Sequence, residues 1–283
     1  MSLTCTSTAL SVTQFRYKKE REQFKNMLFQ LIQYIKFLLK STNQHGVHSP
    51  FVYDLITKCF YDKTSYTEYN AIKVYRSKLL QNRNTIQVND LGLGSRKTKT
   101  NIRLVNEIAK TSGTTLKRSK LLFRISKYFK PDQVLELGTS LGIATHALAT
   151  GNPKANITTI EGCPEIASFS KKQLHQYKNI ELKIGDFKDL LPKLTNKSYN
   201  LIFFDGNHKK EATLQYFEAL LPTINNNTVF IFDDIYWSKG MTEAWETIKL
   251  HPKVTVTIDT FFWGFVFFRK EQVKEHFSIR VNH

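Results

Sequence analysis

The fold is decided by the stretch from Val134 to Gly142, which reads VLELGTSLG. Its first four residues have the composition of a short buried strand, and an apolar helical pattern begins at about Ile143. Gly138 and Gly142 allow a tight turn in which the backbone approaches a ligand closely. Because ligands of open parallel sheets bind beyond the carboxyl ends of the strands, this strand-to-helix turn is the predicted binding site.

Short apolar runs alternate with helical patterns around this turn, which predicts right-handed crossovers and a parallel sheet covered by helices on both faces. Two further β-rich runs, 254–260 and 262–268, are nearly adjacent and predict an antiparallel hairpin. We therefore expect an α/β fold: a Rossmann-like doubly wound sheet, mostly parallel with an antiparallel C-terminal hairpin strand, plus an N-terminal helical extension. The predicted strands are 133–137, 156–160, 180–184, 199–204 and 228–232, and the predicted helices include 116–129, one from about Ile143, one from about Pro164 and one that ends at Leu221.

The positive charge of the chain is concentrated in its first half. The 283 residues carry a formal net charge of +17; residues 1–130 hold 24 Lys and Arg against 7 Asp and Glu, whereas residues 131–283 hold 17 of each kind. We therefore expect a basic, mainly helical extension or cap over 1–110 and a cofactor-binding domain over 111–283. The basic half indicates either an anionic partner, such as nucleic acid or acidic lipid, or a solvated basic surface, and composition does not separate the two.

Residues 14–40 have apolar side chains at helical spacing, with lysines and arginines elsewhere on the cylinder, and predict an amphipathic basic helix. Such a helix can lie on a membrane surface. We favour packing on the core or on a second subunit, and the second of these would give a homodimer through this helix. Further along, Ser49 is expected to cap a helix that begins at Pro50.

The three cysteines, Cys5, Cys59 and Cys163, fit neither a metal-knuckle spacing nor a disulfide framework. This favours a reducing, cytoplasmic setting. The longest apolar run, 27–39, is interrupted by polar residues and falls short of the roughly 20 residues that a transmembrane helix needs.

Acidic residues mark three successive predicted strands. Glu136 lies in the first, Glu161 ends the second before Gly162, and Asp186 follows the third. Glu136 can accept from a cationic group or a hydroxyl, and Glu161 can accept from both hydroxyls of a ribose. Asp186 can accept from an adenine amino group, and Phe187 can lie against the ring. Each acid alone is as well explained as a helix cap, but three in order predict one nucleoside-containing cofactor.

The segments 134–139, 160–162, 185–186, 204–208 and 232–234 carry a resemblance to a known family. Residues 111–237 resemble class I methyltransferases of the small-molecule O-methyltransferase group, which includes the catechol and caffeoyl-coenzyme A O-methyltransferases, and the relatives known as methyltransferase family 24. The resemblance implies that 111–283 is a methyltransferase domain whose cofactor is S-adenosyl-L-methionine. This agrees with a turn that lacks the third glycine of the dinucleotide fingerprint. The predicted cofactor-binding residues are Glu136, Gly138, Thr139, Ser140, Gly142, Glu161, Gly162, Asp186, Phe187 and Asp205.

Three aspartates follow the fourth and fifth predicted strands: Asp205, Asp233 and Asp234. Converging carboxylates suit Mg²⁺ or another divalent cation. Members of the resembled group hold a catalytic metal, with aspartates at the positions matching Asp205 and Asp233 and an asparagine at the position matching Asp234. The third aspartate departs from that pattern but keeps an oxygen ligand. The alternative stays open that Asp205 contacts the methionine end of the cofactor while the other two cap the next segment.

His208 lies where the resembled enzymes place a lysine that acts as a base. Because a histidine titrates near neutrality, it can take the proton of an acceptor hydroxyl, and with Asp205 it forms the predicted catalytic pair. The alternative is a purely local role near the start of a helix.

Four residues are candidates for contact with the methyl acceptor. Tyr236 and Trp237 follow the acidic pair and can form an acceptor wall, although aromatic residues there are as often core. His45 and His48 can reach the site from the N-terminal cap, although a structural role is favoured for such a pair.

The predicted function is S-adenosylmethionine-dependent methylation of a hydroxyl on a small molecule. The alternative is an RNA methyltransferase that holds tRNA or rRNA with the basic half, but no Asn-Pro-Pro-Tyr motif or cysteine nucleophile follows the fourth or fifth strand. A non-catalytic binding protein is a third class. Residues 90–95, DLGLGS, also look like a glycine turn, but no apolar-faced helix follows and we interpret them as a basic loop that can cover the site.

Overall fold

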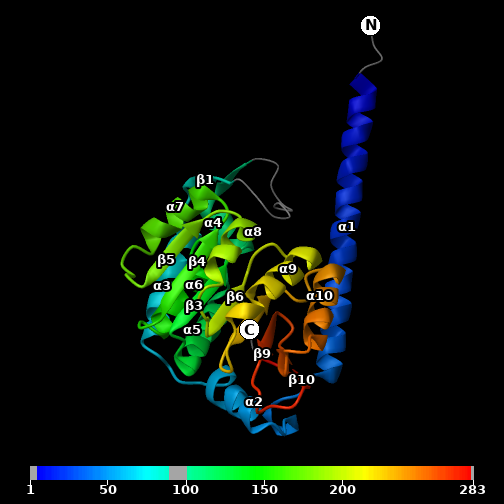
Figure 1. The fold of residues 1–283 in the computed structure, drawn as a ribbon. Coiled ribbons are helices and arrows are strands. Elements are labelled where there is room, and N and C mark those ends of the chain that lie inside the picture. The colour runs from blue at the N-terminus through cyan, green and yellow to red at the C-terminus, as the bar shows by residue number, and fades with distance from the viewer. Residues whose placement is uncertain (1–4, 89–100, 282–283) are drawn as a thin grey trace.

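The computed structural model describes residues 5–88 and 101–281. Their centre is an eight-stranded sheet in the order β10-β8-β9-β7-β6-β3-β4-β5, and a separate two-stranded sheet pairs β1 (Thr85–Gln87) with β2 (Ile102–Leu104) (Figure 1). The strands of the main sheet are β3 (Gln133–Leu137), β4 (Asn156–Glu161), β5 (Ile180–Ile184), β6 (Leu201–Phe204), β7 (Val229–Asp233), β8 (Val256–Asp259), β9 (Trp263–Phe267) and β10 (Glu275–Ser278).

The pairing of the strands confirms the predicted fold class. The strands from β3 to β7 are parallel, and β3 lies between β4 and β6, so the strand order reverses at the predicted turn. β9 pairs antiparallel with both β7 and β8, which confirms the predicted C-terminal hairpin. β10 adds a strand parallel to β8 at the edge, which the sequence did not predict.

Helices cover both faces of the sheet (Figure 1). The helix predicted over 116–129 is α5, and the helices predicted from Ile143 and Pro164 begin at those residues. Thr115 caps α5 by accepting from the Arg118 amide, and the helix ends before Pro131 as expected. The helices are α1 (Cys5–Lys40), η1 (Gln44–Gly46), α2 (Pro50–Leu55), η2 (Ile56–Phe60), α3 (Glu68–Gln81), α4 (Val105–Thr111), α5 (Leu116–Phe129), α6 (Ile143–Gly151), α7 (Pro164–Gln173), α8 (Phe187–Leu190), η3 (Leu191–Leu194), α9 (Lys210–Leu220), η4 (Leu221–Thr223) and α10 (Lys239–Leu250).

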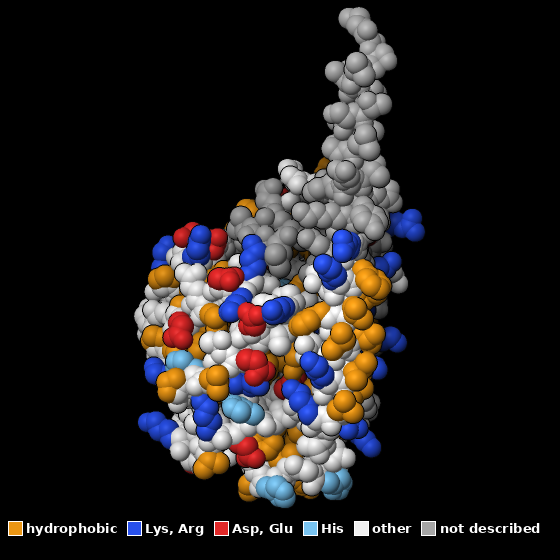
Figure 2. All heavy atoms as spheres, turned by 90° about the vertical axis from the view of Figure 1, so that its right-hand side faces the viewer, with side chains coloured by type: hydrophobic (Ala, Val, Ile, Leu, Met, Phe, Trp, Pro, Cys, Tyr) orange, Lys and Arg blue, Asp and Glu red, His pale blue; other side chains and the backbone are white. Residues whose placement is uncertain are grey.

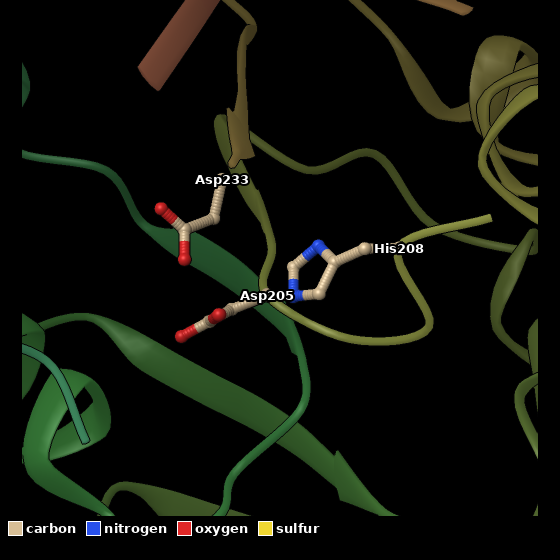
Figure 3. Close-up of side chains that lie close together, drawn as sticks. All are labelled: Asp205, His208 and Asp233. Atoms are coloured by element: carbon tan, nitrogen blue, oxygen red, sulfur yellow. The ribbon is translucent and has the colours of Figure 1, made fainter. Parts of the chain in front are cut away.

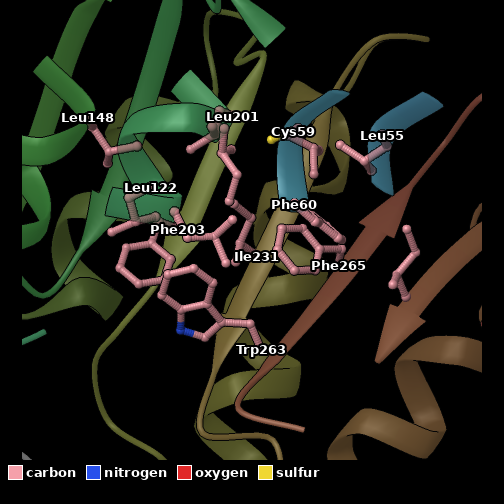
Figure 4. Packing of buried hydrophobic residues seen from close by; sticks show 14 of the residues in the cluster. Leu55, Cys59, Phe60, Leu122, Leu148, Leu201, Phe203, Ile231, Trp263 and Phe265 are labelled. Atoms are coloured by element: carbon pink, nitrogen blue, oxygen red, sulfur yellow. The ribbon is translucent and has the colours of Figure 1, made fainter. Parts of the chain in front are cut away.

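The core has two main layers, one on each face of the sheet. On one face, α2, η2, α3, α5 and α6 pack against side chains such as Phe203 and Phe265 (Figure 4). On the other face, α9, α10 and the end of α1 cover alternate residues of the same strands, such as Phe204 and Phe232. Strand residues therefore alternate between two buried layers, as expected for a sheet covered on both sides.

The segment after α1 ties the N-terminal part of the chain to the sheet. Ser49 accepts a hydrogen bond from the Val52 amide and Pro50 opens α2, which confirms the predicted cap. Val52 is fully buried, and the Phe60 ring lies 5.0 Å from the Phe265 ring. Residues before 111 thus contribute to the same core, and the division of the chain at 110 stays a prediction.

The long helix α1 spans the predicted segment 14–40 and begins earlier, and its N-terminal part extends beyond the body of the molecule (Figure 1). In the part of the chain that the structure describes, no helix has both the length and the apolar character to cross a membrane.

We predict that Phe265→Ala lowers the free energy of unfolding by about 3–5 kcal/mol, because it leaves a cavity among fully buried rings. Urea denaturation measures this. The control Leu250→Ala removes an exposed side chain and should cost less than about 0.5 kcal/mol. Equal losses in the two variants would contradict the assignment of the core.

Candidate functional site

The turn after β3 has the backbone that its glycines predict. Gly138 has φ +108° and Gly142 has φ +76°, a region that favours glycine. A Cβ at Gly138 would overlap the backbone carbonyl of Asp205, so this turn packs directly against the end of β6. Ser140 also has a positive φ, and its amide donates to the Glu161 carboxylate at 2.8 Å. The turn is therefore held between the ends of β4 and β6.

Glu136 lies inside the sheet with no exposed surface. The hydroxyls of Thr145 and Thr159 donate to its Oε2 at 2.5 and 2.6 Å, whereas Oε1 finds no hydrogen-bond partner among the described residues. Burial raises the pKa of Glu136 to about 7, and the two threonine hydroxyls oppose that rise. A buried carboxylate oxygen without a partner fits a ligand that brings a donor or a positive charge.

Glu161 ends β4 and has both carboxylate oxygens at backbone amides: Oε2 accepts from Ser140, and Oε1 accepts from Cys163 at 2.9 Å. Gly162 lies between these partners. These bonds fix the direction of the carboxylate, and a carboxylate oxygen has a second lone pair for a ligand hydroxyl. Thr139 is buried beneath the turn, where its hydroxyl lies 2.6 Å from the Thr159 hydroxyl.

Asp186 follows β5 and caps α8, since its Oδ1 accepts from the Lys188 amide at 2.9 Å. The adjacent Phe187 ring packs edge-on against Tyr216, with the ring centroids 5.4 Å apart. It also lies over Gly206, where a Cβ would meet the ring. Both residues therefore lie beside the chain that leaves β6, at the carboxyl edge of the sheet.

A group of three side chains gathers where β6 and β7 end. Asp205, His208 and Asp233 each place one potential ligand atom within 4.8 Å of the others (Figure 3). Burial raises the pKa of Asp205 well above its usual range, and the charge of Asp233 and a hydrogen bond with it raise that pKa further. Two acidic groups this close share a proton or hold a cation.

Two residues that the sequence did not predict hold Asp233 in place. The indole Nε1 of Trp263 donates to Asp233 Oδ1 at 2.6 Å, and the Arg118 guanidinium lies 3.6 Å from the same oxygen. The guanidinium also lies 4.2 Å above the centre of the Phe262 ring. Arg118 is one of many basic residues in its half, and its place on α5 gives no sign in the sequence that it reaches the end of β7. Trp263 reaches Asp233 because β9 pairs with β7.

The structure changes the composition of the predicted acidic triad. His208, not Asp234, joins Asp205 and Asp233 in the group of three. Asp234 has φ +53°, in the left-handed region, and its carboxylate is not among the three ligand atoms that gather here. Its negative charge still contributes to the raised pKa of Asp205.

The two aromatic candidates have different surroundings. Tyr236 is buried and its hydroxyl donates to Asp259 Oδ2 at 2.6 Å, so it belongs to the packing between α1 and β8. Burial and the negative charge of Asp259 raise the pKa of Tyr236. Trp237 instead lines a cavity of about 360 Å³. The cavity lies between the segments that follow β6 and β7, and its lining includes His208, Trp237, Ser238 and Glu243.

His45 and His48 are not brought to this edge of the sheet. They precede α2, where the Phe51 ring packs on Phe267, and Phe267 pairs with Val229 at the amino end of β7. The site lies at the carboxyl end of β7, so the strand separates it from both histidines. The predicted loop at 90–95 lies outside the described residues.

The sequence of this chain is similar to known methyltransferases. The family model described as "Methyltransferase domain", methyltransferase family 24, matches residues 135–235. Catechol O-methyltransferase of Mycobacterium tuberculosis is 26% identical over 128 residues, which is 44% of this chain and 57% of that protein, so the chain matches little more than half of its length.

Two solved structures show the same fold. The SAH-bound methyltransferase PaMTH1 of Podospora anserina superposes with a TM-score of 0.53 at 16% identity, covering 74% of this chain and 99% of that one. The cofactor-bound protein Rv0187 from MTB gives a TM-score of 0.52 at 16% identity, covering 73% and 92%.

We predict that Gly138→Ala weakens S-adenosylmethionine binding by at least roughly ten-fold, because the added Cβ overlaps the Asp205 carbonyl and forces the turn away from β6. Isothermal titration calorimetry measures this. The matched control is Gly240→Ala, where the Cβ meets only ordinary contacts, and binding should change less than about two-fold. Normal binding by Gly138→Ala would show that the cofactor does not use this turn.

We predict a pH-dependent stability difference between the parent and Glu136→Gln. Folding raises the pKa of Glu136 from 4.5 to about 7, so the folded protein binds this proton more tightly than the unfolded chain does. The resulting contribution to the free energy of unfolding is complete below about pH 4.5 and is lost as the pH rises to about 7. Relative to the glutamine variant, the parent should lose about 2–4 kcal/mol over this range. Urea denaturation of the two ligand-free proteins across the range measures it, and parallel stability curves would contradict it.

Proposed function

We propose that this chain, which carries a class I S-adenosylmethionine-dependent methyltransferase domain of the catechol O-methyltransferase-like group, methylates a hydroxyl oxygen of a small molecule. The observation that carries the proposal is the position of Asp205, His208 and Asp233. They lie between the glycine turn, which packs on Asp205, and the cavity that His208 lines.

The proposed cofactor site uses the carboxylates at the strand ends. Glu161, already oriented by the Ser140 and Cys163 amides, accepts from the ribose hydroxyls. Asp186 and Phe187 hold the adenine, the first by hydrogen bonding and the second by contact with the ring. Glu136, whose Oε1 has no hydrogen-bond partner among the described residues, lies in β3 two residues before Gly138, and the positively charged methionine end binds at this turn.

The acceptor binds, in this proposal, in the cavity beside His208 and Trp237. Methyl transfer requires the acceptor oxygen to lie in line with the bond between the sulfonium and its methyl group. The oxygen forms a bond to the methyl carbon while the carbon–sulfur bond breaks and its electron pair stays on sulfur. His208 takes the hydroxyl proton as the oxygen attacks, since an imidazole is a competent base near neutral pH.

A divalent cation fits the same group of side chains. Asp205 and Asp233 supply carboxylate oxygens that would hold the ion, and the ring nitrogen of His208 beside them stays available for the hydroxyl proton. Burial and the charge of Asp233 raise the pKa of Asp205, and a bound cation would lower it. Bound there, Mg²⁺ or a similar ion would lower the pKa of the acceptor hydroxyl. Arg118 and Trp263 orient Asp233 whether or not a cation is bound.

Nothing specific at this edge favours the RNA alternative. A curated relative is a catechol O-methyltransferase. The cavity is lined by the chain that leads into α9 and α10 and by their first turns, and its two lysines, Lys209 and Lys210, are accompanied by Glu211 and Glu243. We therefore keep a small molecule as the proposed acceptor.

We predict that His208→Ala lowers kcat toward a catechol by about 100-fold or more, because the proton of the hydroxyl loses its acceptor. Binding of S-adenosylmethionine, measured by calorimetry, should stay within about two-fold of the parent. The control is Asp234→Asn. Asp234 lies outside the group of three side chains, and asparagine is the residue that the resembled enzymes have at this position, so the variant should keep most of the activity. Full activity of His208→Ala would exclude it as the base.

We predict that a chelator lowers the methylation rate and that added Mg²⁺ restores it, with Asp205→Asn and Asp233→Asn insensitive to both. The same titrations on Asp234→Asn should follow the parent. If chelation does not change the rate of the parent, the cation has no part in the reaction. The proposed mechanism would then use His208 as the base and a proton shared by Asp205 and Asp233.

A further inference from the structure

The side of α1 that faces away from the molecule is apolar. Besides Tyr34, which packs on Phe261, eight large apolar residues between 24 and 39 are exposed, from 38% at Leu38 to 83% at Leu39. On a helix of 3.6 residues per turn they form one continuous row. We call them the α1 row: Phe24, Met27, Leu28, Leu31, Ile32, Ile35, Leu38 and Leu39.

The opposite side of α1 is the side that holds it to the body. The Gln30 side chain donates to the Trp237 carbonyl at 2.9 Å, and the Phe37 ring lies 5.7 Å from the Phe261 ring. The Lys40 Nζ lies 3.2 Å from Asp259 Oδ2. A surface helix of a globular protein normally turns its apolar side inward, so the fold itself does not account for the α1 row.

Positive charge accompanies the α1 row. Arg21, Lys25 and Lys36 are exposed, and the last two lie about three turns apart on one margin of the row. Figure 2 shows the hydrophobic side chains as a column with Lys and Arg beside it. The sequence from 23 to 53 contains no Asp or Glu. The partner that complements this surface is therefore apolar and anionic.

From these observations we infer that α1 docks on the surface of a bilayer that contains anionic lipid, with the α1 row in the lipid and the basic margin at the headgroups. Helices with an apolar side of Phe, Leu and Ile and a Lys- and Arg-rich polar side bind membranes in this orientation. A second copy is less favoured, because the α1 rows of two copies would bring their lysines together without acids between 23 and 53 to compensate.

The docked orientation has a consequence for the site, although the inference does not rest on the proposed function. Gln30 holds the backbone of Trp237, and Trp237 lines the cavity beside His208. The bilayer would therefore lie on the outer side of a helix that contacts the backbone of a residue lining this cavity.

The test is flotation of the full chain with vesicles of phosphatidylcholine, with or without phosphatidylglycerol. The parent should float with the anionic vesicles and bind pure phosphatidylcholine at least about ten-fold more weakly. Leu31→Glu with Ile35→Glu should lower binding to anionic vesicles at least about ten-fold. Lys25→Gln with Lys36→Gln should lower it roughly 25-fold, since each basic residue near such a surface contributes a factor of about five.

The matched control is Leu250→Glu with Val273→Glu, which adds the same charge at exposed apolar positions elsewhere and should leave vesicle binding unchanged. Circular dichroism verifies that each variant is folded. The inference is overturned if the parent does not bind anionic vesicles or if the control loses as much binding as the α1 variants. It is also overturned if sedimentation equilibrium shows a dimer that Leu31→Glu with Ile35→Glu dissociates while vesicle binding is absent. In that case the α1 row binds a second copy of the chain. From Phe24 to Leu38 the apolar residues recur at alternate intervals of four and three residues, which is the spacing of a coiled-coil seam.

Discussion

The molecule depends on the crowding of carboxylates at one edge of a parallel sheet. Buried carboxylates side by side repel one another and lose hydration, so they need protons, donors or a cation. Glu136 obtains donors from two threonines for one oxygen, Glu161 obtains backbone amides for both, and Asp233 obtains an indole and a guanidinium. Burial and the charge of Asp233 raise the pKa of Asp205 well above its usual range. A cationic cofactor end or a metal ion bound beside these two aspartates would stabilise their ionised forms.

The two halves of the site are joined by the glycine turn. Because Gly138 has no side chain, the turn after β3 can pack against the backbone of Asp205 at the end of β6. The turn proposed to receive the cofactor and the group proposed to face the acceptor are consequently neighbours in space, although Gly138 and Asp205 lie 67 positions apart in the sequence. Methyl transfer needs this proximity, since the donor carbon and the acceptor oxygen must be held in line.

The regular part of the fold could be predicted from the sequence because strand and helix periodicity is local. The predicted starts of β3, β4 and β5 coincide with the observed ones, and the hairpin of β8 and β9 has the expected pairing. The edge strand β10 escaped prediction because its four residues, Glu-His-Phe-Ser, have no distinctive apolar pattern.

The direction of individual side chains could not be predicted in the same way. Asp234 has a left-handed backbone conformation, and the third member of the group with Asp205 and Asp233 is His208. Tyr236 is next to Trp237 in sequence, yet its hydroxyl is held by Asp259, on a strand of the C-terminal hairpin. Arg118 reaches Asp233 only because the sheet brings α5 beside the end of β7. Each of these outcomes depends on contacts between distant segments, which periodicity does not report.

The most direct test of the cofactor site is a crystal structure of the protein with S-adenosylhomocysteine. The expected result places the ribose hydroxyls within hydrogen-bonding distance of Glu161 and the adenine beside Asp186 and Phe187, with the sulfur over the turn at Gly138. A nucleoside bound away from all three carboxyl-edge acids, Glu136, Glu161 and Asp186, would contradict the assignment of this edge as the catalytic site.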